Sequence, residues 1–201
     1  MPITGWVKAQ TVAGTGWTPS GAASLLLALA SPNDSQIAVH AHPATDKLRC
    51  VNYDFAAEGL ISTDVIEGIE FQCYGSTGLP EIVGGNTIGC RITLDGTTPV
   101  GAEKTFDCDG PGMQNATLGG ASDPWGLSLT GTDVLTATFG CLIAEGFDTA
   151  GDLNGRQVDY ERMRIHYSAG TVPAPISTIL EDIDYIPGTG ISLPDDATRR
   201  S

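Results

Sequence analysis

The chain is predicted to form β-strands because apolar and polar residues alternate along several short segments. In residues 65–75, Ile69, Phe71 and Cys73 occupy alternate positions, with polar or glycine residues between them. Successive side chains of a strand point to opposite faces, so this alternation places one face on a core and the other toward solvent. Comparable segments are found at residues 47–55, 86–101, 138–146 and 156–170.

Two of these segments carry further information. In residues 156–170, Arg162, Arg164 and His166 alternate with apolar residues, so we expect these basic side chains to face solvent. Residues 86–101 contain Asp95-Gly96, a pair that favours a two-residue turn between antiparallel strands. This segment is therefore predicted to begin a β-hairpin.

The predicted fold class is all-β, an antiparallel sandwich of the jelly-roll type. At least five strand-like segments lie between residues 47 and 170, and no long amphipathic helix separates them. The 26 glycines and 12 prolines supply many turn residues. The sequence AASLLLALA at 22–30 fits either a short helical turn or a buried strand. We expect an N-terminal arm at 1–16, a sandwich at 17–168 and an extended C-terminal arm at 169–201.

The C-terminal arm is predicted to become ordered by docking on a partner. Its apolar residues cannot build a core of their own because Pro173, Pro175, Pro187 and Pro194 interrupt them. They are also too numerous for an idle solvated tail. The predicted docking residues are Ile176, Ile179, Leu180, Ile183, Tyr185, Ile186, Ile191 and Leu193.

Trp125 is predicted to form a corner of the core. Gly126 lets the backbone turn tightly beside the indole, and Phe139 opens an uncharged segment typical of a central strand. The alternative is a stacking platform for a sugar. That alternative requires Trp6 or Trp17 to lie beside Trp125.

Composition narrows the possible partners. The net charge is −14, which disfavours a nucleic-acid partner because phosphates would be repelled. The longest apolar stretch, at 22–30, is too short to span a bilayer, so no membrane partner is expected.

The N-terminus lacks the features of a signal peptide, which predicts synthesis in a reducing cytoplasm. The five cysteines form no CxxC pair, and Cys73, Cys90 and Cys141 fit small buried hydrophobic residues.

No constellation of residues predicts catalysis, a cofactor or a metal. The serines lack a nucleophile elbow, and His40 and His42 are interpreted as a solvent-facing pair in preference to metal ligands. The oxygen-bearing side chains after residue 147 suggest a calcium loop, but the acidic residue that should close such a loop is missing. Those side chains are Asp148, Asp152, Asn154 and Asp159. The protein is therefore expected not to be an enzyme.

The order of several motifs resembles a family of jelly-roll-like virion proteins of tailed bacteriophages. The matching pieces are GWTPSGA, SPNDSQIA, VIEGIEFQC, GGASDPWGLSLTGTDV followed by FGCLI, and VDYERMRIHYS, which together span residues 17–168. The sequence departs from the family pattern at AAEGLISTD, where a proline-containing turn is usual, and at Glu161, where an apolar residue is usual.

The resemblance implies a structural role in a virion, as a capsid decoration protein, head fibre or tail appendage. The leading expectation is a cement protein that binds the outer phage shell, with the major capsid protein or other virion proteins as partners and a trimer or dimer as the assembly. It would be made in the host bacterial cytoplasm. The alternative is a tail or head-fibre appendage that binds host glycans through exposed aromatic residues. The candidates are Trp6, Trp17, Tyr53, Tyr74 and Trp125.

Overall fold

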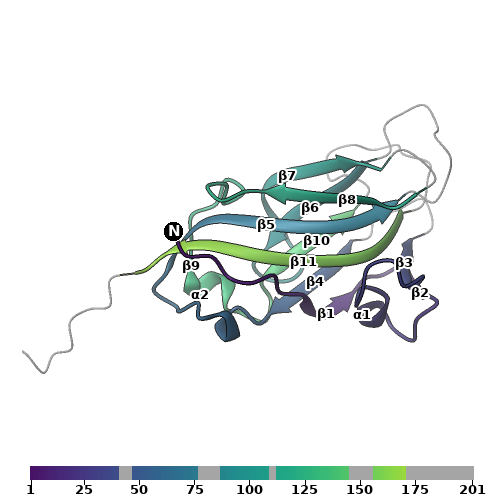
Figure 1. Cartoon of the computed structure of the whole chain (residues 1–201), viewed down its shortest axis with the longest axis horizontal. Helices are drawn as coiled ribbons and strands as arrows, with labels where there is room; N and C mark the ends of the chain where they lie inside the picture. The colour runs from purple at the N-terminus through teal and green to yellow at the C-terminus, as the bar shows by residue number, and fades with distance from the viewer. Residues whose placement is uncertain (41–46, 77–86, 109–111, 145–155, 171–201) are drawn as a thin grey trace, which may run out of the picture. The chain divides into compact units, whose positions relative to one another are not determined.

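The two sheets of a β-sandwich account for nearly all regular structure in the part of the chain that the structure describes. The computed structural model describes residues 1–40, 47–76, 87–108, 112–144 and 156–170. In these ranges the strands form two antiparallel sheets (Figure 1). The prediction of an all-β antiparallel sandwich is confirmed.

The first sheet has five strands in the order β1-β4-β10-β6-β7. β10 lies at its centre, and all five β10 residues are buried. The uncharged sequence of this strand follows from that position, because both of its neighbours and the opposite sheet exclude water. The strands of this sheet are β1 (Ala9–Ala13), β4 (Leu48–Tyr53), β6 (Thr87–Thr93), β7 (Pro99–Asp107) and β10 (Gly140–Ala144).

The second sheet has six strands, in the order β2-β3-β11-β5-β8 with β9 paired to β5. Its two longest strands, β5 and β11, lie side by side. The strands are β2 (Trp17–Ser20), β3 (Ile37–His40), β5 (Val65–Ser76), β8 (Gln114–Gly119), β9 (Leu129–Thr130) and β11 (Arg156–Ser168). Short helices occur between strands, namely α1 (Leu25–Ala28), a 3-10 helix (Ala56–Glu58) and α2 (Gly131–Val134). The AASLLLALA segment thus contains a helical turn, which Ser24 caps by accepting a hydrogen bond from the Leu27 N–H.

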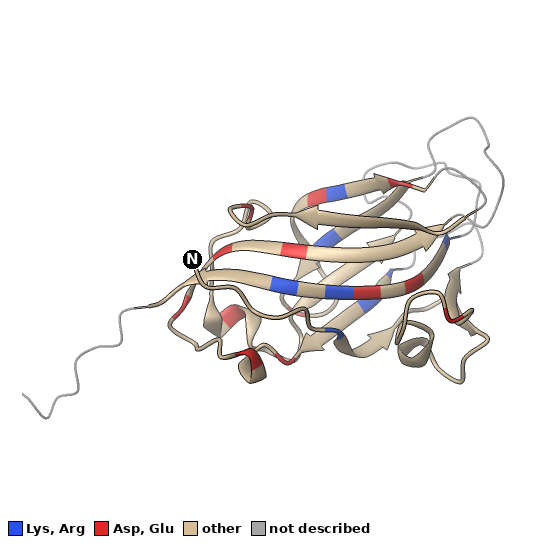
Figure 2. Ribbon diagram, in the orientation of Figure 1, with Lys and Arg blue, Asp and Glu red and all other residues tan. Residues whose placement is uncertain are grey.

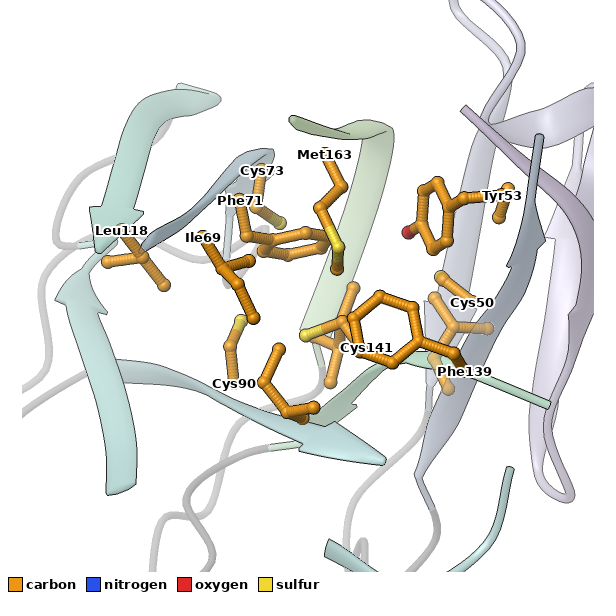
Figure 3. Packing of buried hydrophobic residues seen from close by; sticks show 14 of the residues in the cluster. Cys50, Tyr53, Ile69, Phe71, Cys73, Cys90, Leu118, Phe139, Cys141 and Met163 are labelled. Carbon is orange, nitrogen blue, oxygen red and sulfur yellow. The ribbon is translucent and has the colours of Figure 1, made fainter. Parts of the chain in front are cut away.

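The core lies between the two sheets and is built from their inward-facing positions. Figure 3 shows Phe71, Met163, Phe139 and Tyr53 packed together with cysteine side chains from both sheets. Cys73, Cys90 and Cys141 are fully buried free thiols, as the sequence predicts. Burial raises the pKa of each of these thiols, so they remain protonated and unreactive at neutral pH.

The first 16 residues are integrated more closely than the predicted arm. β1 pairs with β4 in the first sheet. Before it, the Thr4 N–H donates to the Ile165 carbonyl at 2.9 Å, and Val7 exchanges two backbone hydrogen bonds with Met163 at 2.8 Å. The physical reason is the length of β11. β3 covers only its first residues, and the N-terminal segment pairs with the remainder of that edge.

The hairpin predicted from Asp95-Gly96 is present, but its turn is longer than two residues. β6 and β7 pair as expected, and residues 94–98 connect them. The Asp95 carboxylate accepts hydrogen bonds from the backbone N–H groups of Thr97 and Thr98, both at 2.7 Å. These bonds stabilise a wider loop and hold the pKa of Asp95 below its ordinary range.

Two histidines that were expected to face solvent are buried. His40 is 3% exposed and packs edge-on against Trp17, with their ring centroids 5.2 Å apart. Ala38 and His40 occupy the inward-facing positions of β3. His40 is therefore buried although its ring is polar. His166 is 7% exposed and contacts Glu70. His42 lies outside the described residues.

Trp125 contacts three strands, β5, β7 and β8. The indole is fully buried, and its Nε1–H donates to the Ile69 carbonyl of β5 at 3.0 Å. The Trp125 carbonyl accepts from Ala102 of β7 at 2.7 Å. Gly119 of β8 lies against the indole, because a Cβ there would be 2.6 Å from Nε1.

The backbone at this corner is left-handed at two successive residues. The φ angles are 60° at Trp125 and 73° at Gly126. Glycine adopts this conformation freely, whereas tryptophan does so only when its surroundings hold it there. Phe139 is also fully buried and packs edge-on against Phe55, with centroids 6.3 Å apart.

Glu161 is an acidic side chain inside the core. It is 1% exposed, its Oε1 accepts from the Ala9 N–H at 2.9 Å, and its Oε2 accepts from the Tyr53 hydroxyl. Burial raises the pKa of Glu161 to about 7, although both hydrogen bonds and Lys8 oppose that shift. The carboxyl therefore ionises at a higher pH in the folded protein than in the unfolded chain.

We predict that replacing Trp125 with alanine destabilises the protein by ~3 to 5 kcal/mol, because the change removes a fully buried indole and leaves a cavity. Urea unfolding followed by circular dichroism measures the loss. Trp6→Ala is the matched control, since Trp6 is only half-buried, and we expect it to cost about 1 kcal/mol or less. Equal stabilities for Trp125→Ala and the native protein would contradict the burial described above.

We also predict that the free energy of unfolding falls by about 3 kcal/mol as pH rises from 4.5 to 7 on account of Glu161 alone. The sign follows from proton binding. In this range the unfolded chain releases the Glu161 proton while the folded protein retains it, so increasing pH favours unfolding. Glu161→Gln should lack this component, and subtracting its unfolding free energies from those of the native protein isolates it. Parallel curves for the two proteins would refute the assignment.

Candidate functional site

The outward face of the six-stranded sheet carries a row of aromatic and amide side chains across three strands. Tyr160 of β11 pairs directly with Tyr74 of β5, which in turn pairs with Asn115 of β8. Directly opposed residues on neighbouring strands hold their side chains next to each other on one face of a sheet. The register therefore places two tyrosine rings and an amide side by side.

The next row on the same face is polar and contains a positive charge. Arg162 pairs with Gln72, and Gln72 pairs with Thr117. The Arg162 Nε–H donates to Gln72 Oε1 at 2.5 Å, which fixes the plane of the guanidinium group. This row lies alongside the row of tyrosines because its residues are two positions further along each strand.

Tyr160, Tyr74 and Asn115 of the first row and Arg162 and Gln72 of the second form the floor of a groove of about 230 Å³. Pro32 and Asn33, from the loop between α1 and β3, form a wall. Asn33 connects this wall to the floor, because its Oδ1 accepts a hydrogen bond from the Tyr74 hydroxyl at 2.8 Å. Its backbone N–H donates to Asp159 Oδ2 at 2.6 Å. The groove is therefore formed by the protein's own hydrogen bonds.

Trp6 lies above the arginines of this face. The Arg162 guanidinium carbon is 4.7 Å from the centre of the Trp6 ring, and the corresponding distance from Arg164 is 4.5 Å. Trp6 precedes Val7, whose pairing with Met163 holds the N-terminal segment against β11. The stacking limits the motion of the Arg162 side chain and keeps it at the groove.

A third row is occupied by an internal charge cluster. The Glu70 carboxylate accepts from Arg164 Nη2 at 2.8 Å and contacts His166 Nε2 at 2.6 Å. Burial raises the pKa of Glu70, but the hydrogen bonds from Arg164 and His166 outweigh it, so the pKa lies below its ordinary value. Figure 2 shows one basic position of β11 beside an acidic position of β5. These charges satisfy one another and leave the first two rows as the candidate site.

The aromatic residues proposed from the sequence divide into two groups. Trp17 and Tyr53 are each 4% exposed and Trp125 is fully buried, so these three belong to the core. Trp6 and Tyr74 lie on the outer face described above. The stacking platform that required Trp6 or Trp17 beside Trp125 is therefore wrong, since the Trp125 ring lies within the core and is capped by the Lys104 ammonium at 5.3 Å.

Sequence reasoning did not identify Tyr160, Asn33 or Asn115 as site residues. A signal for Tyr160 exists, because Tyr160 shares the alternation of Arg162 and Arg164 on the predicted outer face of the strand. Asn33 and Asn115 become neighbours of the tyrosines only through loop conformation and strand register.

The remaining candidate ligand residues do not meet in the described structure. In residues 1–40, 47–76, 87–108, 112–144 and 156–170, no group of three or more histidine, cysteine or acidic side chains is arranged to hold a metal ion. Over the same ranges no helix has the length and apolar character to cross a membrane.

Asp148, Asp152 and Asn154 lie outside the described residues, as do the docking residues predicted between Ile176 and Leu193.

Comparison with known proteins finds a distant likeness of fold. No protein-family model and no curated protein matches the sequence. Among solved structures, the chain is similar to the N-terminal CBM22-1-CBM22-2 tandem domain of Xyn10C from Paenibacillus barcinonensis, with 14% sequence identity and a TM-score of 0.37. The match covers 85% of this chain and 43% of that chain, so the protein spans less than half the length of the matched structure. The likeness is between β-sandwiches, and it assigns the chain to no family.

Proposed function

We propose that this protein binds carbohydrate, without catalysis, in the groove on the outer face of the six-stranded sheet. The observation that carries the proposal is the pairing of Tyr74 with Tyr160 beside Arg162, Gln72 and Asn115 in one groove. These are the side-chain types that a sugar requires. The function corresponds to the glycan-binding appendage that the sequence offered as an alternative.

The side chains of the groove match both the apolar C–H groups and the polar hydroxyl groups of a sugar ring. A tyrosine ring presents an apolar, electron-rich face to the C–H groups of a pyranose, while its hydroxyl remains available for hydrogen bonding. Amide side chains both donate and accept hydrogen bonds, as sugar hydroxyl groups do, and a guanidinium group supplies further donors. Apolar walls with a few fixed polar groups are typical of small-ligand sites.

The site requires little reorganisation to bind. Tyr74 is hydrogen-bonded to Asn33, and Arg162 is held by Gln72 and stacked on Trp6. Ordering a flexible side chain on binding costs about 0.5 to 1.5 kcal/mol, and fixed side chains avoid most of that cost. A rigid groove on paired strands therefore favours binding of a ligand that lies along its surface, because few side chains must be ordered.

The groove has the composition of a binding site and lacks the groups that glycoside cleavage requires. Hydrolysis of a glycosidic bond ordinarily needs two carboxyl groups on either side of it. The residues described as lining this groove are Pro32, Asn33, Gln72, Tyr74, Asn115, Tyr160 and Arg162, and none of them carries a carboxyl group.

We predict that Tyr74→Ala and Tyr160→Ala each weaken saccharide binding by ~10-fold or more, because each removes a ring that contacts the ligand. A glycan array with the native protein selects the ligand, and titration calorimetry measures the variants. Tyr74→Phe is the matched control. It keeps the ring and loses only the hydrogen bond to Asn33, so it should retain most of the affinity.

Gln10→Ala serves as a second control, because Gln10 is an exposed residue of β1 in the other sheet. Thermal unfolding of all variants separates loss of binding from loss of folding. Unchanged affinity in folded Tyr74→Ala and Tyr160→Ala proteins would overturn the proposed site.

A second proposal is the decoration role implied by the virion resemblance, with the major capsid protein as partner. One observation favours it. Ile3, Ile61 and Val65 are 44%, 48% and 47% exposed, and they lie near the end of β11. Ile3 bridges to His166, Val65 pairs with Ser168, and the Gly170 N–H donates to Asp64. Exposed apolar side chains at this end offer a surface for protein contact.

For this second role, we predict that deleting residues 171–201 leaves a folded sandwich that binds phage particles poorly. The compact unit comprises Met1–Thr171, so the deletion removes only its last residue and should leave the melting temperature nearly unchanged. Copy number on purified particles, measured by quantitative mass spectrometry, gives the outcome. Full occupancy by the truncated protein would exclude the arm as the docking element. Replacing exposed Leu26 and Leu27 with serine controls for a general loss of surface hydrophobicity.

A further inference from the structure

We propose that the saccharide held by the groove is acidic and that the Arg162 guanidinium binds its carboxylate. This inference rests on the carbohydrate-binding function proposed above and specifies its ligand. The expected class is an oligosaccharide that contains a uronic or sialic acid. Arg162 is then the residue that determines specificity, while Tyr74 and Tyr160 hold the sugar rings.

The first argument is that the charge of Arg162 has no acidic partner within the described residues. The neighbouring Arg164 pairs with Glu70 at 2.8 Å, and on the other strands Lys104 pairs with Asp123 at 2.6 Å. Arg162 instead donates its Nε–H to the neutral amide of Gln72. In a protein of net charge −14, a half-buried arginine left without a carboxylate has the capacity to bind one from a ligand.

The second argument concerns which edge of the guanidinium is available. Gln72 occupies Nε, and no other described residue accepts from the two Nη groups of Arg162. Two aromatic rings lie against the guanidinium group, with the ring centres of Trp6 and Tyr160 at 4.7 Å and 5.7 Å from its central carbon. An arginine held in this way presents its Nη edge, and a planar carboxylate can pair with that edge through two parallel hydrogen bonds.

The third argument is the local charge of the groove. Arg162 is the one charged residue among those described as lining the groove, and its charge is positive. Two acids lie next to the wall, but Asp159 is 2% exposed and its Oδ2 already accepts from the Asn33 N–H, and the carboxylate of Asp34 accepts from Gln36. Burial also raises the pKa of Asp159. Long-range repulsion therefore disfavours polyanions in general, while one carboxylate beside two tyrosines is accepted.

The test compares acidic saccharides with uncharged saccharides of the same structure. Oligosaccharides that carry a single galacturonic, glucuronic or sialic acid are each titrated beside their methyl esters, with a singly sulfated galactose oligosaccharide as a second anion. For the native protein we expect at least one acid to bind ~10-fold tighter than its ester. Arg162→Gln should abolish that preference by weakening the binding of the acid far more than the binding of its ester, while Arg162→Lys should keep part of the preference.

Arg91→Gln is the charge-matched control, because it removes one positive charge from β6 of the other sheet. It should leave the preference for acids unchanged. Equal binding of acids and esters would overturn this inference and leave carbohydrate binding standing, as would tighter binding of the sulfated sugar than of every carboxylate. Failure to bind any saccharide, by a protein that unfolds cooperatively on heating, would overturn both.

Discussion

The structure depends above all on the antiparallel pairing of β5 with β11. Eleven residue pairs join these strands, from Gln157 with Ser76 to Ser168 with Val65. One side of the ladder supplies Phe71, Ile69 and Met163 to the core. The other side supplies both rows of the groove. A shift of register by one residue would exchange the two faces, so core packing and groove assembly are fixed by the same set of backbone hydrogen bonds.

The ladder contains an irregularity that matters for the site. Between Val158 and Tyr160 the register shifts by one residue, at Asp159. Before the shift Val158 faces the core, and after it Glu161 and Met163 do. A bulge of this kind inserts one residue and changes which side chains share a face. It brings Tyr160 opposite Tyr74 and leaves Asp159 positioned to accept a hydrogen bond from Asn33.

Local alternation was sufficient to predict β4, β5, β6, β10 and β11, because a side chain's face depends on neighbours two positions away; strands β1, β2, β3, β8 and β9 were not predicted. It therefore gave the inward positions of residues 65–75 and the outward positions of Arg162 and Arg164. Glu161, which the sequence marked only as a departure from an apolar position, lies on the inner face, where Tyr53 and Ala9 serve as hydrogen-bond donors to it. These donors come from distant segments, so no local pattern reveals them.

The groove was less accessible to sequence reasoning because it is a product of register. Asn115 and Tyr74 are far apart in the chain and meet only because β8 pairs with β5. His40 and His166 are a second case in which the sequence alone was not sufficient, because both were expected to be exposed. Both carry polar rings, and both are buried because neighbouring strands and the N-terminal segment cover them. Polarity predicts exposure only where the topology leaves a face uncovered.

Two consecutive residues show how one strand contributes to the core and to the groove separately. Glu161 points inward, where its carboxylate is bound by two donors and contributes to a sealed core. Arg162 points outward, where two aromatic rings and one amide hold it without neutralising it. Because successive side chains of a strand are on opposite faces, substitutions at 162 alter the groove with little effect on packing at 161. The charge of Arg162 therefore lies outside the core, in the groove of the outer face.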